Sequence, residues 1–272
     1  MFKTRLLSGI VLVLVALVTI ISGGKILWLT CLVISLLGLN ELYRAVGVES
    51  TKKRENWGLA CAGYLAVFAH YLILILGQES YSMVSMVFIL IFIMSVYVFT
   101  FPKYNAEQVM AAYFGVIYVG VMISYIYQTR MLEDGAFLVW LIFLCSWGCD
   151  TCAYCVGVLF GKHKMSPKLS PKKSVEGAVG GVAGAALLGA IYAFAVSEHL
   201  MTDGNPMILY ALICAVGALI SMAGDLAASA IKRNHQIKDY GKLIPGHGGI
   251  LDRFDSVIFT APIIYFLAIV LM

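Results

Sequence analysis

Residues 207–230, with the sequence MILYALICAVGALISMAGDLAASA, decide the fold class of this chain. A membrane-spanning helix needs about 20 consecutive, mostly apolar residues, and this run meets that length with a single charged side chain, Asp225. The rest of the chain has the same character, because 61% of its 272 residues are apolar and only 12% are charged. We therefore predict an all-α, polytopic membrane protein.

Further apolar stretches of similar length occur along the whole chain, and together they predict about nine transmembrane helices. The predicted spans run roughly over residues 6–23, 26–46, 58–77, 82–101, 109–127, 136–161, 178–196, 207–230 and 254–272. Lys and Arg are unevenly distributed between them, since all of the 19 basic residues except Lys25 and Arg130 fall on one side. Cytoplasmic loops carry this excess, which places the N-terminus and loops 162–177 and 232–253 inside. The net charge of +4 reflects the same bias, so we expect no nucleic-acid partner.

Asp150 and Asp225 are carboxylates within predicted spans, where an ionisable residue indicates a functional site because burying its charge in the bilayer is unfavourable. Asp150 lies in span 136–161 and Asp225 in span 207–230. Ser229 and Lys232 follow Asp225 at helical spacing, so carboxylate, hydroxyl and ammonium are expected to share one helix face. For Asp150 the alternative is an interhelical hydrogen bond that only fixes packing.

The loop 162–177 carries several lysines that suit a bound polyphosphate, which needs several fixed donors. Pro171 stiffens the turn before Lys172 and Lys173, and Ser174 with Glu176 is expected to begin the next helix, whose N-terminus would face an anion. The alternative is a basic anchor attracted to anionic lipid headgroups. Glycines at 177, 180, 181 and 184 predict close packing of that helix against a neighbour.

A second polar segment contains the sequence IPGHGG at residues 244–249, which predicts a sharp turn with backbone N–H groups exposed to phosphate oxygens. Asp252 and Asp255 then open the last predicted helix, where they either complement the helix dipole or bind a cation. Carboxylate oxygens favour Mg²⁺, which keeps waters and takes substrate phosphates as its remaining ligands. Together with the nearby lysines, these residues predict phosphoryl or nucleotidyl transfer at the inner membrane face.

The segment from Ser229 to Asp255 resembles the signature of the phosphatidate cytidylyltransferases, which make CDP-diacylglycerol. The matching residues are Ser229, Ile231, Lys232, Arg233, Lys238, Asp239, Gly241, Ile244, Pro245, His247, Gly248, Gly249, Ile250, Asp252, Arg253 and Asp255. The similarity extends upstream to Asp150, Thr151, Ala153, Tyr154, Gly157, Gly161, Lys162, His163 and segment 170–177, and so covers the C-terminal half. Ala228, Gln236 and Tyr240 stand where the family usually has Glu, Gly and Ser.

The resemblance implies a bacterial-type enzyme of the cytoplasmic (inner) membrane that transfers CMP from CTP, or dCTP, to phosphatidic acid and releases pyrophosphate. It implies Mg²⁺ as cofactor, K⁺ as a second cation and contact with membrane lipids, and it allows a homodimer. The catalytic residues that it implies are Asp225, Asp252, Lys232 and Arg233. The substrate or nucleotide contacts are Ser170, Pro171, Lys172, Lys173, Ser174, Glu176, Lys238, Asp239, His247, Gly248, Gly249, Arg253 and Asp150. The metal ligands are Asp225 and Asp252, with Asp255 as the third candidate.

On this basis residues 1–135 form the N-terminal transmembrane helices, with about five spans. Residues 136–272 form a catalytic transmembrane region with cytoplasmic loops 162–177 and 232–253. Two alternatives remain open, a CTP-using lipid kinase of similar topology and a transporter for an anionic substrate with charged residues at a broken helix. The charges gather in two loops on the same side and the sequence has no internal repeat, which argues against transport.

Overall fold

The structure is a computed structural model that describes residues 2–49, 57–200, 204–246 and 248–272. Most of these residues are helical. The helices are α1 (Phe2–Ser22), α2 (Gly24–Ala45), α3 (Trp57–Ile75), α4 (Ser82–Phe99), α5 (Ala106–Gly115), α6 (Met122–Arg130), α7 (Gly135–Phe143), α8 (Cys149–Phe160), α9 (Val175–Val196), α10 (Pro206–Asn234) and α11 (Leu251–Leu271). Short helical turns are η2 (Glu79–Tyr81), η3 (Val116–Val121), η4 (Leu144–Gly148) and η5 (Ser197–His199), and the strands are β1 (Lys164–Ser166) and β2 (Ser170–Ser174).

Eight helical stretches among the described residues are long and apolar enough to cross a membrane. They are Gly24–Ala45, Trp57–Ile75, Ser82–Phe99, Ala106–Arg130, Gly135–Phe160, Val175–His199, Pro206–Asn234 and Leu251–Leu271. The remaining predicted span corresponds to α1, whose apolar part within the described residues, Ser8–Ser22, is shorter. Each stretch predicted as a span is helical, and the all-α polytopic membrane fold is confirmed.

Two of the spans are interrupted by π-helical turns. In Ala106–Arg130 the turn is η3, and in Gly135–Phe160 it is η4, which ends immediately before α8. A π-turn inserts an extra residue into the helix and is frequently found at functional sites. The second turn ends two residues before Asp150, the carboxylate in the first turn of α8.

The chain forms two compact units. The first unit comprises Met1–Tyr127 and His235–Arg253, and the second comprises Gln128–Asn234 and Phe254–Met272. The predicted catalytic region, residues 136–272, therefore contributes to both units. The segment 235–253 groups with the N-terminal helices, although it follows α10 in the sequence.

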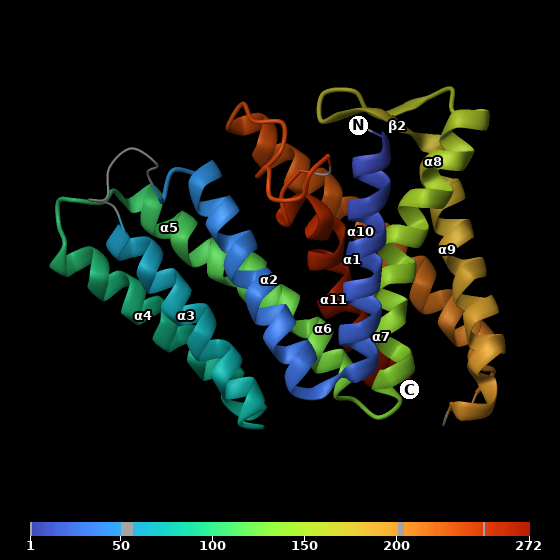
Figure 1. The fold of residues 1–272 in the computed structure, drawn as a ribbon, viewed down its shortest axis with the longest axis horizontal. Coiled ribbons are helices and arrows are strands. Elements are labelled where there is room, and N and C mark those ends of the chain that lie inside the picture. The colour runs from blue at the N-terminus through green and yellow to red at the C-terminus, as the bar shows by residue number, and fades with distance from the viewer. Residues whose placement is uncertain (1, 50–56, 201–203, 247) are drawn as a thin grey trace. The chain divides into compact units, whose positions relative to one another are not determined.

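In the first unit, α2, α3, α4 and α5 pack side by side (Figure 1). Tyr43 of α2 lies fully buried among them, and its hydroxyl donates a hydrogen bond of 2.7 Å to the carbonyl of Ala112. A Cβ at Gly115 would lie 2.7 Å from the Tyr43 ring, so the glycine makes room for the aromatic side chain. Close approach through small residues is how helices associate in lipid, where apolar surface alone gives little driving force.

In the second unit, α9 packs along both α8 and α10 (Figure 1). A Cβ at Gly177 would lie 2.7 Å from the carbonyl of Ala153, and one at Gly181 would lie 3.0 Å from the thiol of Cys149. These distances confirm that the glycines at the start of α9 serve close helix packing. The contact between α8 and α9 fixes one wall of the cavity described below.

Strands β1 and β2 form an antiparallel hairpin, with Lys164 opposite Ser174. The sequence analysis placed a loop here and did not predict its two strands. The ends of the loop are tied together by Glu176, whose carboxylate accepts the backbone N–H groups of Lys162 and His163 at 3.1 and 3.2 Å. With its ends held, the short segment pairs with itself. The predicted start of the next helix is confirmed, since the Ser174 hydroxyl accepts the Gly177 N–H at 3.1 Å.

Candidate functional site

The second unit contains a cavity of about 490 Å³ formed by α8, the β hairpin, α9 and α10. Its polar lining consists of Asp150, Lys164, Lys172, Lys173, Ser174 and Asp225. Its apolar lining includes Ala153, Tyr154, Val158, Met165, Ala178 and Met222. A cavity of this size is typical of small-molecule sites. The structure therefore brings together five of the residues predicted for the site: Asp150, Lys172, Lys173, Ser174 and Asp225.

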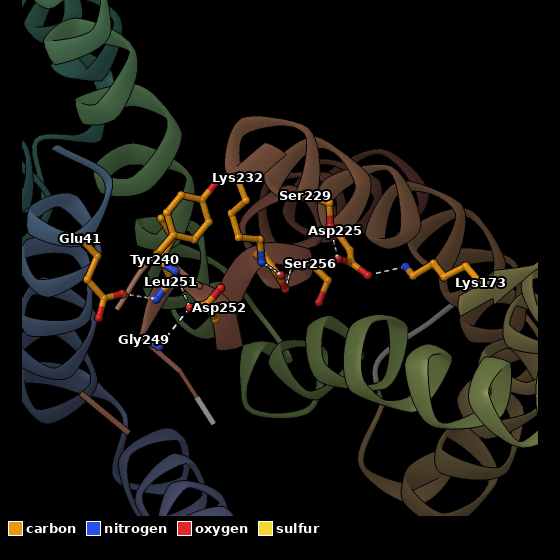
Figure 2. Close-up of polar contacts among 11 residues, drawn as sticks. Glu41, Lys173, Asp225, Ser229, Lys232, Tyr240, Gly249, Leu251, Asp252 and Ser256 are labelled. Atoms are coloured by element: carbon orange, nitrogen blue, oxygen red, sulfur yellow. Dashed lines mark hydrogen bonds and ion pairs between the residues drawn. The ribbon is translucent and has the colours of Figure 1, made fainter. Parts of the chain in front are cut away.

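Asp225 and Lys173 form an ion pair at this cavity, through Oδ2 of the carboxylate and Nζ of the lysine. The other carboxylate oxygen, Oδ1, accepts a hydrogen bond of 3.4 Å from the Ser229 hydroxyl, one helical turn along α10. Figure 2 shows the three side chains in a row. The prediction that Asp225 and Ser229 share one helix face is confirmed. The cation that contacts Asp225 is Lys173 of strand β2.

Asp255 and Lys232 form a second pair, in which the Lys232 ammonium lies 3.9 Å from Oδ2 of Asp255. Both side chains are largely buried. At this distance and an effective dielectric constant of about 20, the attraction is on the order of 4 kcal/mol before desolvation is subtracted. Gly224 allows α10 and α11 to cross here, because a Cβ at that position would lie 3.0 Å from the Asp255 carbonyl. Asp225 follows Gly224 directly, so the two carboxylates belong to segments that cross.

The oxygen atoms at this site can be compared with the ligands that Mg²⁺ needs. Among the residues that the structure describes, no group of three or more His, Cys, Asp or Glu side chains is placed to hold a metal ion. Mg²⁺ does not need such a group, because it is usually held by one or two carboxylates and completes its shell with waters and substrate phosphates. Asp225 and Asp255 provide two carboxylates, and the Ser229 hydroxyl lies beside the first. The chemistry of these donors fits Mg²⁺.

The first unit holds the glycine loop, which we define as residues 240–246 and 248–250. Asp252, only 6% exposed, accepts two backbone N–H groups at Oδ2, from Tyr240 at 2.8 Å and from Gly249 at 3.0 Å (Figure 2). Gly248 has a φ of 89°, a conformation that favours glycine, and its carbonyl accepts the Ile244 N–H at 2.9 Å. The predicted sharp glycine turn is confirmed, and Asp252 anchors it.

The other predicted residues differ in their surroundings. Arg233, Lys238, Asp239 and Arg253 are exposed, which leaves their side chains accessible to a ligand. His247 lies outside the described residues. The contacts of Asp252 organise the loop, and its role as a metal ligand stays a prediction.

In the hairpin, the Glu176 carboxylate also contacts the His163 ring, with 2.6 Å between Oε1 and Nδ1. Its contacts therefore hold the hairpin together. Pro171 is exposed in β2, where its missing N–H leaves the ladder undisturbed at an edge. Ser170 pairs with Ser166 across the hairpin. The substrate contacts predicted for these residues stay predictions.

Glu41 is a polar residue of this region that the sequence analysis missed. It lies on α2 with 8% exposure, and its two carboxylate oxygens accept the N–H groups of Ile250 at 3.0 Å and Leu251 at 2.8 Å. Figure 2 shows the contact with Leu251. The sequence motifs all lie in the C-terminal half and do not include α2. An ionisable residue within an apolar span was nevertheless a sufficient signal.

Comparison with known proteins extends over nearly the whole chain. The family model described as the cytidylyltransferase family matches residues 3–271. The phosphatidate cytidylyltransferases of Staphylococcus epidermidis, Staphylococcus haemolyticus and Staphylococcus aureus are 33%, 32% and 30% identical to it, each over 98% of this chain and 99% of the relative. The similarity thus includes the N-terminal helices, where the sequence motifs gave no resemblance.

Proposed function

The chain belongs to the cytidylyltransferase family, and we propose that it is a phosphatidate cytidylyltransferase of phospholipid biosynthesis. It transfers CMP from CTP to phosphatidic acid and yields CDP-diacylglycerol and pyrophosphate. The observation that carries this proposal is the cavity of the second unit, which combines three lysines and two carboxylates with an apolar wall. A phospholipid substrate needs both surfaces, because one end of the molecule is anionic and the other is a hydrocarbon.

The cavity suits phosphatidic acid in particular. Lys164, Lys172 and Lys173 offer ammonium groups to the phosphate. Tyr154 and Val158 of α8 line the cavity and are also 74% and 66% exposed, so the apolar wall continues onto the outer face of the span. The acyl chains of the lipid can lie along this face while the phosphate rests among the lysines.

We place CTP at the glycine loop of the first unit. Backbone N–H groups in a glycine turn bind phosphate oxygens, and the exposed side chains of Lys238 and Arg253 flank the loop in sequence. His247, Gly248 and Gly249 are expected to surround the nucleotide. Lys232 and Arg233, at the end of α10, are expected to contact the triphosphate or the lipid phosphate.

The reaction needs little acid–base chemistry from the protein. A phosphate monoester has a second pKa near about 6, so phosphatidic acid is largely a dianion at neutral pH. One of its oxygens attacks the α-phosphorus of CTP, a new P–O bond forms, and the bond to the β-phosphate breaks with loss of pyrophosphate. The lysines neutralise charge on the phosphoryl oxygens.

We propose Mg²⁺ dependence on the basis of the donor set. Asp225 and Asp255 would hold the ion, together with Asp252 as predicted from the sequence. When bound, Mg²⁺ supplies positive charge to the phosphoryl oxygens. A second cation such as K⁺ and a homodimer stay predictions from the family resemblance.

We also propose a location in the bacterial cytoplasmic membrane, with the N-terminus, the hairpin and the glycine loop on the cytoplasmic side. The distribution of Lys and Arg supports this orientation. Cysteines introduced at Ser166 and Lys238 should react with a membrane-impermeant thiol reagent only in inside-out vesicles. A cysteine at Gly204 should react only in right-side-out vesicles, and labelling in the reverse pattern would contradict the orientation.

The activity is tested by following each phosphorus of CTP. Purified protein with phosphatidic acid, Mg²⁺ and α-labelled CTP should give a labelled lipid, whereas γ-labelled CTP should give labelled pyrophosphate. A lipid kinase would give the opposite distribution. Label in the lipid from γ-labelled CTP alone would refute the proposal, and no label in the lipid from either nucleotide would favour the transporter.

A further inference from the structure

We infer that Glu41 of α2 is a positioning residue for the transfer reaction, acting through the glycine loop. The inference rests on the proposed function, which places CTP on that loop. It gives the N-terminal helices a part in nucleotide binding, although the predicted site residues all lie between Asp150 and Asp255.

Glu41 fixes the point where the glycine loop becomes helix α11. Its oxygens accept the N–H groups of Ile250 and Leu251, which are separated from it by 209 and 210 residues in sequence. The first N–H groups of a helix have no partner within the helix, and a carboxylate there is doubly favourable because it also faces the positive end of the helix dipole. Glu41 therefore caps α11 from another helix.

Two glycines of the segment leave the space that Glu41 occupies. A Cβ at Gly241 would lie 2.7 Å from Cδ of Glu41, and a Cβ at Gly249 would lie 2.5 Å from the same atom. Both distances are too short for a real contact, so any side chain at either position would displace the carboxylate or the loop. Gly241 and Gly249 are thus matched to an acidic residue far away in sequence.

Glu41 and Asp252 together determine the conformation of the loop. They accept four backbone N–H groups, from Tyr240, Gly249, Ile250 and Leu251. With both carboxylates bound in this way, the backbone at Tyr240 and from Gly249 to Leu251 is held in place before a ligand arrives. Preorganisation of this kind reduces the entropy lost on binding, so removing it weakens affinity for whatever the loop holds.

Glu41→Gln is the test variant, because it keeps the size of the side chain and replaces one acceptor oxygen with an NH₂ group that faces a backbone N–H. We expect KM for CTP to rise by about ten- to a hundredfold, while KM for phosphatidic acid stays within about threefold of wild type. Equilibrium binding of CTP to the detergent-solubilised protein, without lipid substrate, should weaken by a similar factor. A purely structural role would reduce the amount of folded enzyme and leave both KM values unchanged.

Glu49→Gln is the matched control. Glu49 follows α2, lies in the same unit and accepts hydrogen bonds from Asn40 and Tyr64 at 3.0 and 2.8 Å. Its carboxylate contacts other residues of α2 and α3, so the substitution should leave KM for CTP within about threefold of wild type.

Gly241→Ala provides a second variant that does not depend on the folding of Glu41→Gln. It retains the carboxylate but pushes it away from the loop, and the same selective rise in KM for CTP is expected. The inference would be overturned if either folded variant had the same KM for CTP as the wild type. It would also be overturned if the KM values for CTP and for phosphatidic acid rose equally. If wild-type protein makes no CDP-lipid from CTP and phosphatidic acid, the proposed function fails instead.

Discussion

Gly177→Ala adds one methyl group at the closest approach of α8 and α9. The new Cβ would lie 2.7 Å from the Ala153 carbonyl oxygen and 2.9 Å from the Ser174 hydroxyl. The first of these atoms belongs to the backbone and cannot rotate away. Because ordinary contact begins at 3.4 Å, the difference requires the two helices to separate by about 0.7 Å.

This separation has consequences for stability and for turnover. Overpacking of a tight interface destabilises by about 1–3 kcal/mol, which corresponds to an apparent melting temperature lower by several degrees. Gly177, Ser174 and Ala153 all line the cavity, so the shift also moves its walls. A displacement near 1 Å at a reacting site can reduce the rate by about a hundredfold, and we expect kcat/KM for phosphatidic acid to fall by about ten- to a hundredfold.

The measurement combines thermal unfolding in detergent with the labelled-CTP assay. Gly148→Ala is the control, since its Cβ would meet only the flexible end of Leu188 at 3.1 Å and its backbone is already helical. Gly148→Ala should keep the melting temperature and the kcat/KM of the wild type. If Gly177→Ala matches wild type in melting temperature and in kcat/KM, the close packing of α8 and α9 does not shape the cavity.

Three further changes test other parts of the structure. Asp225→Asn removes one carboxylate of the crossing between α10 and α11 and should leave less than about a tenth of wild-type turnover at saturating Mg²⁺, with normal elution on size exclusion. Retention of more activity would exclude Asp225 from the metal shell. Lys172→Ala combined with Lys173→Ala should raise the KM of a substrate by about tenfold or more while leaving association with anionic liposomes nearly unchanged. An unchanged KM with weaker association with liposomes would indicate that the lysines are a membrane anchor. Gln236→Gly should raise the unfolding temperature slightly or leave it unchanged, because Gln236 follows α10 with a φ of 56° and glycine adopts this conformation without strain. A clear drop would show that the Gln236 side chain has a stabilising contact.

Features that depend on short stretches of sequence could be predicted. A run of about 20 apolar residues is sufficient to specify a span whatever surrounds it. The spacing of Asp225 and Ser229 follows from the helical repeat, and the hydroxyl of Ser174 reaches the N–H of Gly177 within one turn. The sharp turn before Gly248 likewise follows from local backbone preference.

Pairings between distant segments required the tertiary structure. Lys173 meets Asp225 because the ends of the hairpin are tied by Glu176 beside α9, and Lys232 meets Asp255 because Gly224 lets α10 and α11 cross. Glu41 meets the glycine loop although about two hundred residues separate them. Charge and hydrophobicity determine which residues need a partner, because an ion in an apolar span must be compensated. Which partner each one finds depends on how the helices pack, and that is determined by side-chain fit between segments that no local pattern connects.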